Sequence, residues 1–317
     1  MSLSALPTSG PSVLPVTDVL AWIIIGVFFA GVLAESTDRR EAARKLTAGA
    51  WGLFSIFWLL LIHFYVFVHR SIVETVLVAI AVPACLYVGW RLYHGRDSLL
   101  VVSRAVAFMG LLYLPFETSP AARQFLIESV ATQTAWLIEA LGYGGGMELI
   151  KDPFDGSGYV NTFFFPATGR SSQIVFACTG LASMAIFGGL SAAVDAPLRR
   201  KVTAVVASVS TIWVLNLGRN AFIALSNGHQ WFDYAWLEGP VMFVFGLSDP
   251  GRVSFFVADR IISQGLAVFA LIGVAWLVSR WLPELLDIAE ELLSLLTGSE
   301  VTLRPPQTAT DGGDRET

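Results

Sequence analysis

Long apolar stretches that are almost free of charge recur along this chain and limit the folds open to it. About 20 such residues in a helix cross the hydrocarbon core of a bilayer. Since 55% of the 317 residues are hydrophobic and only 14% are charged, the chain is too apolar for a soluble domain. The sequence therefore predicts an all-α polytopic membrane protein with about seven transmembrane helices. The expected spans are residues 17–35, 46–68, 73–93, 98–116, 173–194, 202–225 and 256–279.

Basic residues gather in every second connection between these spans. Lys and Arg concentrate on the cytoplasmic side of membrane proteins, so these connections are expected to face the cell interior. The N-terminus then lies outside and the C-terminus inside, in a multi-pass protein of the cell membrane. The basic residues concerned are Arg39, Arg40, Arg44, Lys45, Arg91, Arg96, Arg104, Arg199, Arg200, Lys201 and Arg280.

The predicted domain organisation is simple. We expect one transmembrane catalytic domain, residues 1–281, followed by a cytoplasmic tail, residues 282–317. The tail begins with a stretch in which acidic and apolar residues alternate at helical spacing, which predicts an amphipathic helix. It ends in a segment rich in Pro, Thr, Gly and Asp, a composition typical of disorder.

Two segments within the transmembrane domain do not fit the pattern of spans. Residues 117–172 are expected to form an external region. Its first part, 120–141, has helical periodicity with polar positions and is predicted to lie at the membrane interface. The aromatic run 159–165 fits either a strand or a loop that dips into the membrane. Residues 236–248 are apolar but short, which favours a re-entrant or interfacial position.

Composition excludes several classes of function. A net charge of −5 without a basic surface argues against a nucleic-acid partner. Four scattered histidines and two separate cysteines give no metal-ligand spacing. The Gly144–Gly146 run fits a flexible connection better than a phosphate-binding loop. We therefore expect neither a cofactor nor a metal.

Three polar residues within the spans invite a functional explanation, because polar groups inside a membrane are costly. Cys178 is predicted near the outer end of the fifth span, Arg219 about two turns from the outer end of the sixth, and Arg260 at the outer start of the seventh. All three are therefore expected at a similar depth on the outer face.

Such a set suits nucleophilic catalysis by a thiol. A thiol attacks a carbonyl as thiolate, and a neighbouring guanidinium stabilises that anion. Arginine stays ionised even when partly desolvated. A second guanidinium can stabilise the oxyanion of a tetrahedral intermediate. The set predicts peptide cleavage or transpeptidation by Cys178.

Other interpretations stay open on the residues alone. A membrane cysteine is most often a packing residue, as we expect for Cys85, and an arginine near a helix end often reaches the head groups. Arg219 and Arg260 could instead line the path of a transporter for an anion or a lipid head group, and a non-catalytic scaffold is a further possibility. Arg252 is a second candidate for the role of Arg260, although it falls in a loop.

Neighbouring residues have simpler interpretations. His229 is expected to be a solvated loop residue. Asp259 could orient Arg260, cap the seventh span, or do both, because aspartate suits a helix N-terminus.

The motifs around these residues are similar to those of the exosortase/archaeosortase family. They are Ala177-Cys178-Thr179-Gly180, Leu217-Gly218-Arg219-Asn220 with Phe222-Ile223-Ala224-Leu225, and Ser254 to Gln264, which contains Asp259-Arg260. The stretches Tyr113 to Thr118 and Ala192 to Pro197 are also similar. The likeness extends over nearly the whole chain.

The resemblance implies an enzyme that recognises a C-terminal sorting signal on exported proteins. That signal consists of a short motif, here expected to be Pro-Gly-Phe, followed by a hydrophobic helix and a basic tail. The implied substrates become lipid-anchored surface proteins, including the S-layer glycoprotein, with a membrane lipid as acceptor.

By motif, Cys178 corresponds to the nucleophile, Arg219 to the second catalytic residue and Arg260 to the third. Exosortases generally have histidine in the third place, and this chain departs from that pattern. Because arginine is a poor proton donor, Arg260 is expected to act mainly as an electrostatic clamp.

Overall fold

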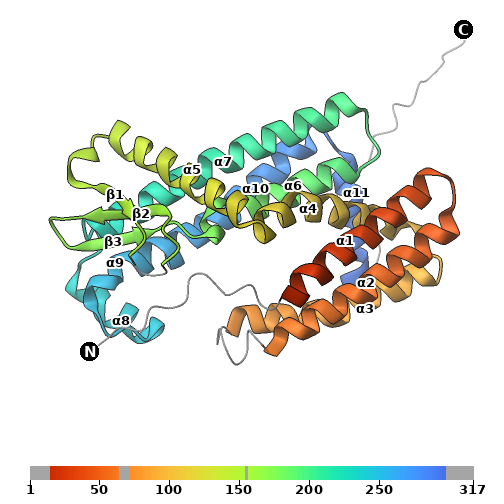
Figure 1. Ribbon diagram of the computed structural model, residues 1–317, viewed down its shortest axis with the longest axis horizontal. Helices are drawn as coiled ribbons and strands as arrows, with labels where there is room; N and C mark the ends of the chain where they lie inside the picture. The colour runs from red at the N-terminus through yellow and green to blue at the C-terminus, as the bar shows by residue number, and fades with distance from the viewer. Residues whose placement is uncertain (1–14, 64–71, 154–155, 298–317) are drawn as a thin grey trace, which may run out of the picture.

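The computed structural model describes residues 15–63, 72–153 and 156–297. Within them, six helices are long and apolar enough to cross a membrane: Thr17–Ser36, Arg40–Ile62, Thr75–Tyr93, Asp97–Thr118, Leu198–Gly228 and Pro250–Ser279. They run roughly along the longest axis of the molecule (Figure 1). The predicted polytopic helical fold is confirmed. The end of the second predicted span, 64–68, lies outside the described residues, as does the end of the tail, 298–317.

The first four helices form one packed group. They are α1 (Pro15–Ser36), α2 (Arg40–His63), α3 (Ile72–Tyr93) and α4 (Leu100–Thr118). α2 packs between α1 and α3, and α1 also packs on α4. Their shared core includes Phe28, Trp51 and Cys85, which are buried. Cys85 is thus a core residue of this group, as the sequence predicted.

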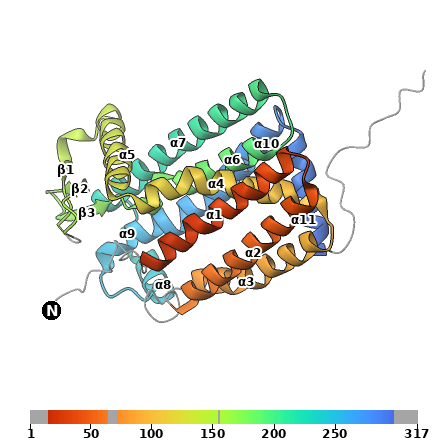
Figure 2. The ribbon, with the colours of Figure 1, turned by 45° about the vertical axis from the view of Figure 1, so that its right-hand side comes forward.

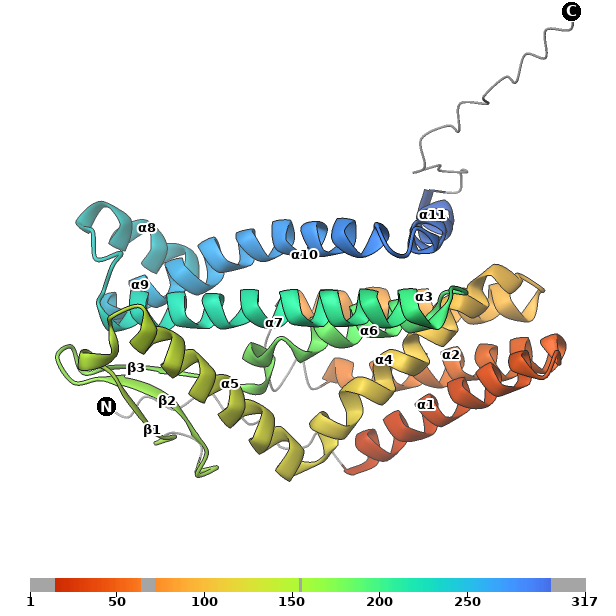
Figure 3. The same ribbon diagram turned by 90° about the horizontal axis from the view of Figure 1, so that it is seen from above.

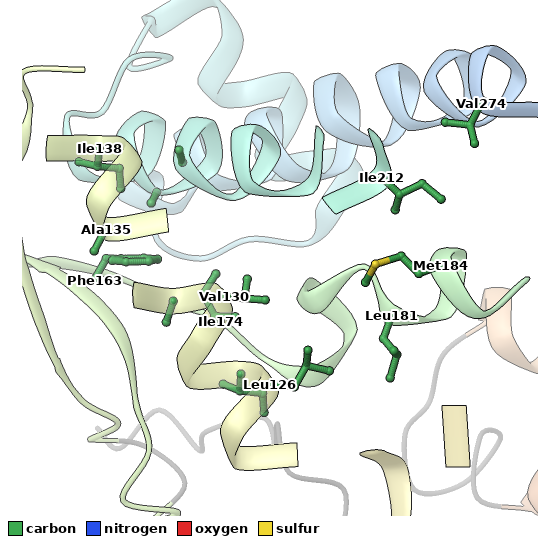
Figure 4. Close-up of a cluster of buried hydrophobic side chains, with 14 of the residues drawn as sticks. Leu126, Val130, Ala135, Ile138, Phe163, Ile174, Leu181, Met184, Ile212 and Val274 are labelled. Carbon is green, nitrogen blue, oxygen red and sulfur yellow. The ribbon is translucent and has the colours of Figure 1, made fainter. Parts of the chain in front are cut away.

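The remaining chain forms a second group around α7. It contains α5 (Pro120–Ala140), α6 (Leu181–Ala193), α7 (Leu198–Gly228), α10 (Gln264–Ser279) and α11 (Glu284–Thr297). α5 begins where its sequence predicts, because Ser119 caps it and Pro120 fits the first turn. Figure 4 shows side chains of α5 beside Phe163, in a buried cluster that also contains Leu181 and Ile212. α6 packs on both α4 and α7, so it joins the two groups.

A small antiparallel sheet interrupts the helices, which the all-α prediction did not include. Its strands are β1 (Glu148–Lys151), β2 (Val160–Phe165) and β3 (Arg170–Gln173), in that spatial order. Thr162 pairs with Gln173, which sets the register of β2 and β3. The aromatic run 159–165 is therefore a strand, not a membrane-dipping loop. Phe163 and Phe165 of this strand are buried against the second group.

The two ends of the molecule differ in character. The sheet lies at one end and α11 at the other in Figures 1, 2 and 3. Ion pairs Arg44–Asp97, Arg104–Asp195 and Arg200–Glu284 tie the basic connections together at the end near α11. We call this the basic end. The short helix α8 (Ala235–Phe245), which contains most of the segment predicted as re-entrant or interfacial, lies near the sheet (Figure 3).

The prediction of seven spans fails at residues 173–194. There β3 ends at Gln173 and α6 does not begin until Leu181. The 13 residues of α6 rise roughly 20 Å, which is less than the ~30 Å core of a bilayer. The apolar residues Ile174 to Ala177 misled the prediction, because they belong to a connection and a turn instead of a helix.

Candidate active site

Cys178 lies in a tight turn and not inside a helix, contrary to the sequence prediction. The 3-10 turn Phe176–Thr179 connects the sheet to α6. It ends at Gly180, whose φ of +76° is a conformation that favours glycine. A Cβ at this position would also meet the side chain of Asn216 at 3.1 Å. The sequence Cys-Thr-Gly thus places the thiol at the start of a short helix, held close to α7.

Two amides of α7 hold the backbone of this turn. The side chains of Asn216 and Asn220 donate hydrogen bonds of 2.8 and 2.9 Å to the carbonyl oxygen of Cys178. Residues four apart lie on the same helix face, so one face of α7 supplies both donors. A carbonyl oxygen has two lone pairs, and here both are used. The turn that carries Cys178 is therefore fixed to two successive turns of α7.

Arg219 lies on the same part of α7 and pairs with an aspartate from the last span. Its Nη2 donates to Asp259 Oδ1 at 2.5 Å, and Oδ2 of the same carboxylate lies 3.3 Å from Arg260 Nε. Asp259 is 9% exposed, so the carboxylate is buried between two guanidinium groups. The resulting cluster Arg219–Asp259–Arg260, hereafter the arginine cluster, carries a formal charge of +1.

The backbone around Asp259 and Arg260 is unusual. Residues Val257–Ser263 form π-helical turns between α9 (Val253–Phe256) and α10. Such turns are rare and occur frequently at functional sites. The three segments Pro250–Arg252, Val253–Phe256 and Val257–Ser263 follow one another without a break. Asp259 is therefore internal to a long helical segment, and the prediction that it caps the seventh span is wrong.

The structure connects the three predicted site residues through α7. Asn216 and Asn220 contact Cys178, Arg219 precedes Asn220, and Asp259 links Arg219 to Arg260. Among the described residues, the Cys178 sulfur accepts no hydrogen bond from either guanidinium, since both are turned toward Asp259. The cluster has one positive charge in excess, which suits a thiolate or an oxyanion beside it.

The competing residues have other partners. Arg252 lies 5.2 Å from the ring centre of Phe256, in a cation–π contact. Nearby, Arg170 of β3 donates to Asp249 at 2.9 Å, and this hydrogen bond holds the pKa of the Asp249 carboxyl below its usual range. His229 packs among aromatic rings that include Trp231. Within the described residues, no hydrogen bond or ion pair joins Arg252, Arg170 or His229 to the arginine cluster.

Within the described part of the chain, no three His, Cys, Asp or Glu side chains gather closely enough to hold a metal ion.

Sequence reasoning missed the two asparagines. A usable signal was present, because Asn216 and Asn220 are amides spaced four apart within a predicted span. Polar side chains at that spacing face the same neighbour and must find partners in a membrane. The π-helical turns left no comparable trace in the sequence.

The asparagine contacts lead to a first prediction. Asn216→Ala and Asn220→Ala are each expected to lower the rate of the reaction at Cys178 about tenfold. Each substitution removes one of the two hydrogen bonds to the carbonyl, which costs about 0.5–1.5 kcal/mol, and 1.36 kcal/mol corresponds to about tenfold. The measurement is kcat and KM, together with the rate at which iodoacetamide alkylates Cys178 in a chain that carries Cys85→Ala.

Asn227→Ala is the matched control for this prediction. Asn227 lies on the same helix but donates to Ser171 and Ser172 of β3 instead of to the Cys178 turn. It is expected to change the alkylation rate less than threefold. Equal effects of all three substitutions would mean that the asparagines stabilise the fold without positioning the thiol.

Comparisons with known proteins find relatives over most of the chain. The family model described as transmembrane exosortase matches residues 17–248. Archaeosortase A of Natronomonas pharaonis is 62% identical over 305 residues, which cover 95% of this chain and 96% of the relative. Archaeosortase A of Haloferax volcanii is 50% identical over 300 residues, which cover 91% and 96%. No solved structure matches the chain significantly.

Proposed function

This chain belongs to the transmembrane exosortase family, and from that membership we propose that it is a membrane-embedded thiol peptidase and transpeptidase that processes a C-terminal sorting signal on exported proteins. The observation that carries the proposal is the turn of Cys178, which two amides fix to α7, the helix that also supplies Arg219 to the arginine cluster. A half-buried thiol in a fixed turn, held by the helix that also carries Arg219, supports acyl transfer through a thioester.

In the first step, the Cys178 thiolate attacks the carbonyl carbon of the scissile peptide bond. A C–S bond forms, and the negative charge moves to the carbonyl oxygen. Arg219 stabilises the thiolate, and Arg260, whose side chain is 53% exposed, is the better placed of the two to meet that oxyanion. The C–N bond then breaks, and the leaving amine takes up through water the proton that the thiol gave up.

In the second step, the thioester passes the substrate to a nucleophile. That nucleophile is the amine of a membrane lipid, with water as the competing acceptor. Enzyme, substrate helix and lipid all lie in one membrane, which raises their effective concentration.

The proposed substrate signal is Pro-Gly-Phe, a hydrophobic helix and a basic tail, and the S-layer glycoprotein is one proposed substrate. The similarity to archaeosortase A supports this assignment. The active site is proposed to face the outside of the cell membrane. In support, the basic connections meet at the basic end, which the positive-inside rule assigns to the cytoplasm, and the turn of Cys178 lies at the other end of α6.

The transporter alternative, in which the two arginines line a path for an anion or a lipid head group, is not favoured. It assigns no role to Cys178 and accounts for neither the fixed turn nor the relatives, which are sortases by name.

Trapping the acyl-enzyme tests the proposal. The full chain, reconstituted in liposomes, is mixed with a substrate that carries the signal and is quenched in acid. We expect a covalent adduct on the peptide that contains Cys178, and we expect neutral hydroxylamine to release it as a hydroxamate. An adduct on another residue, or processing without any adduct on this peptide, would overturn the mechanism.

A further inference from the structure

A cavity of about 510 Å³ lies between the two helix groups. Its walls come from α1, α2, α4, α6 and the first turn of α5, and most of them are apolar, as with Ile24, Phe57 and Ala185. The polar lining residues Asp18 and Glu117 lie near the start of α1 and the end of α4. A hydrogen bond of 3.2 Å from Trp22 to Thr118 joins these two helix ends. The cavity is thus an apolar space with one polar mouth.

The mouth of this cavity adjoins the turn that carries Cys178. Phe176, in that turn, meets the Tyr113 ring edge-on at 5.7 Å and lies under the Arg123 guanidinium at 5.2 Å. Tyr113 and Arg123 both line the cavity, as does Ala182, four residues after Cys178. The turn that carries Cys178 therefore packs against residues that line the cavity near its mouth.

The size of the cavity fits one hydrocarbon chain. Its lining runs from Asp18 to Ile25 along α1 and from Thr118 to Val106 along α4, which corresponds to a depth of roughly 10–18 Å at 1.5 Å per residue. Half of a ~30 Å bilayer core lies in this range. A spanning helix about 10 Å wide would need a volume on the order of 2,000 Å³, so the helix of a substrate does not fit.

The charge of the mouth favours a cationic head group. Arg123 pairs with Glu117 at 2.9 Å, so the two charges offset each other. Asp18 adds a second carboxylate, which leaves a formal charge of −1. A primary ammonium complements this charge and donates hydrogen bonds to carboxylates, whereas the quaternary ammonium of choline has no N–H to donate and a head group with only negative charge does neither.

We propose that this cavity binds one hydrocarbon chain of an amine-bearing lipid and presents its amine to the acyl group on Cys178. The inference rests on the proposed function, for which it supplies the site of the acceptor. A mouth carboxylate takes one proton from the ammonium, and the free amine attacks the thioester carbon. A C–N bond forms, the C–S bond breaks, and the second proton passes from nitrogen to the Cys178 sulfur.

Photo-crosslinking in liposomes tests the site. The probes are phosphatidylethanolamine with a diazirine along one chain and phosphatidylcholine with the same chain. We expect the ethanolamine probe to label peptides of α4 and α6 that line the cavity at least fivefold more than the choline probe. Asp18→Lys is expected to remove that preference. Asp233→Lys makes the same change of charge at an exposed site outside the cavity and is expected to preserve it.

A second pair of variants tests the cavity by volume. Ile186→Trp places a larger side chain on the cavity wall and is expected to lower labelling by the ethanolamine probe at least fivefold. Ile272→Trp changes an exposed residue of α10 outside the cavity and is expected to leave labelling unchanged. Ile186 is 45% exposed, so this substitution disturbs the packing less than a change at the buried Ala185 would.

Two outcomes would overturn the inference. Equal labelling by both probes would show that the mouth does not select an amine. Labelling that stays high in Ile186→Trp, or that falls outside α4 and α6, would place the lipid elsewhere. Labelling needs no reaction at Cys178. If no acyl-enzyme formed, the labelling result would still stand. If labelling failed, the acyl-enzyme result would still stand.

Discussion

Cys178→Ala is expected to lower processing of a sorting-signal substrate by at least about a thousandfold. Removal of the nucleophile in a comparable thiol or serine mechanism leaves only the contributions of binding and oxyanion stabilisation. Cys178→Ser is expected to be nearly as defective, because a hydroxyl near guanidinium groups is not converted to an alkoxide at neutral pH. The measurement is the conversion of full-length substrate to processed product on a gel, with purified enzyme in liposomes.

Cys85→Ala provides the matched control for this prediction. The two cysteines are the only ones in the sequence, and Cys85 is buried in the core of the first helix group, apart from the site. We expect Cys85→Ala to process substrate within threefold of the unchanged enzyme. Undiminished processing by Cys178→Ala would end the thiol mechanism.

Arg219→Ala is expected to lower processing about 10²–10³-fold, the cost of one lost electrostatic stabiliser in related mechanisms. The substitution removes the partner that Asp259 holds at 2.5 Å, so the cluster loses its excess positive charge. Arg219→Lys is expected to recover less than a tenth of the activity, because an ammonium lacks the planar fork of a guanidinium. The measurement is kcat and KM, with the larger effect expected on kcat.

Arg170→Ala is the control for Arg219. It also breaks an arginine–aspartate pair, Arg170–Asp249 at 2.9 Å, but this pair joins β3 to the loop before α9. We expect less than a threefold loss of activity. If Arg170→Ala and Arg219→Ala were equally defective, the ion pairs would matter for the fold alone, and the electrostatic role of Arg219 would be rejected.

Hydropathy predicted most of the membrane helices but not the local structure at Cys178. The other six predicted spans correspond to helices because each is long, apolar and bounded by charged residues. The segment before α6 is equally apolar, and hydropathy alone does not separate a strand end, a turn and a helix. The positive φ of Gly180 is the physical reason why the chain turns there.

The sequence offered candidate site residues but not their contacts. The expected depth of Arg219 and Arg260 came from the predicted span positions, whereas the shared partner Asp259 depends on how α7 packs against the π-helical turns. The carbonyl contacts of Asn216 and Asn220 depend on the same tertiary packing. Sequence periodicity records which residues face a neighbour, but not which neighbour they meet.

The shortness of α6 has a consequence for the proteins that this enzyme can accept. A 13-residue helix whose C-terminal end lies at the basic end is roughly 20 Å long, so its N-terminal end lies about 10 Å beneath the opposite boundary of a ~30 Å bilayer core. On the proposed mechanism, the scissile bond must therefore reach the thiol below that boundary. An extended chain covers about 3.3 Å per residue, so a folded ectodomain needs a flexible tether of roughly three residues or more ahead of the cleaved bond. A folded domain that ended directly at the sorting motif would be sterically excluded from the active site.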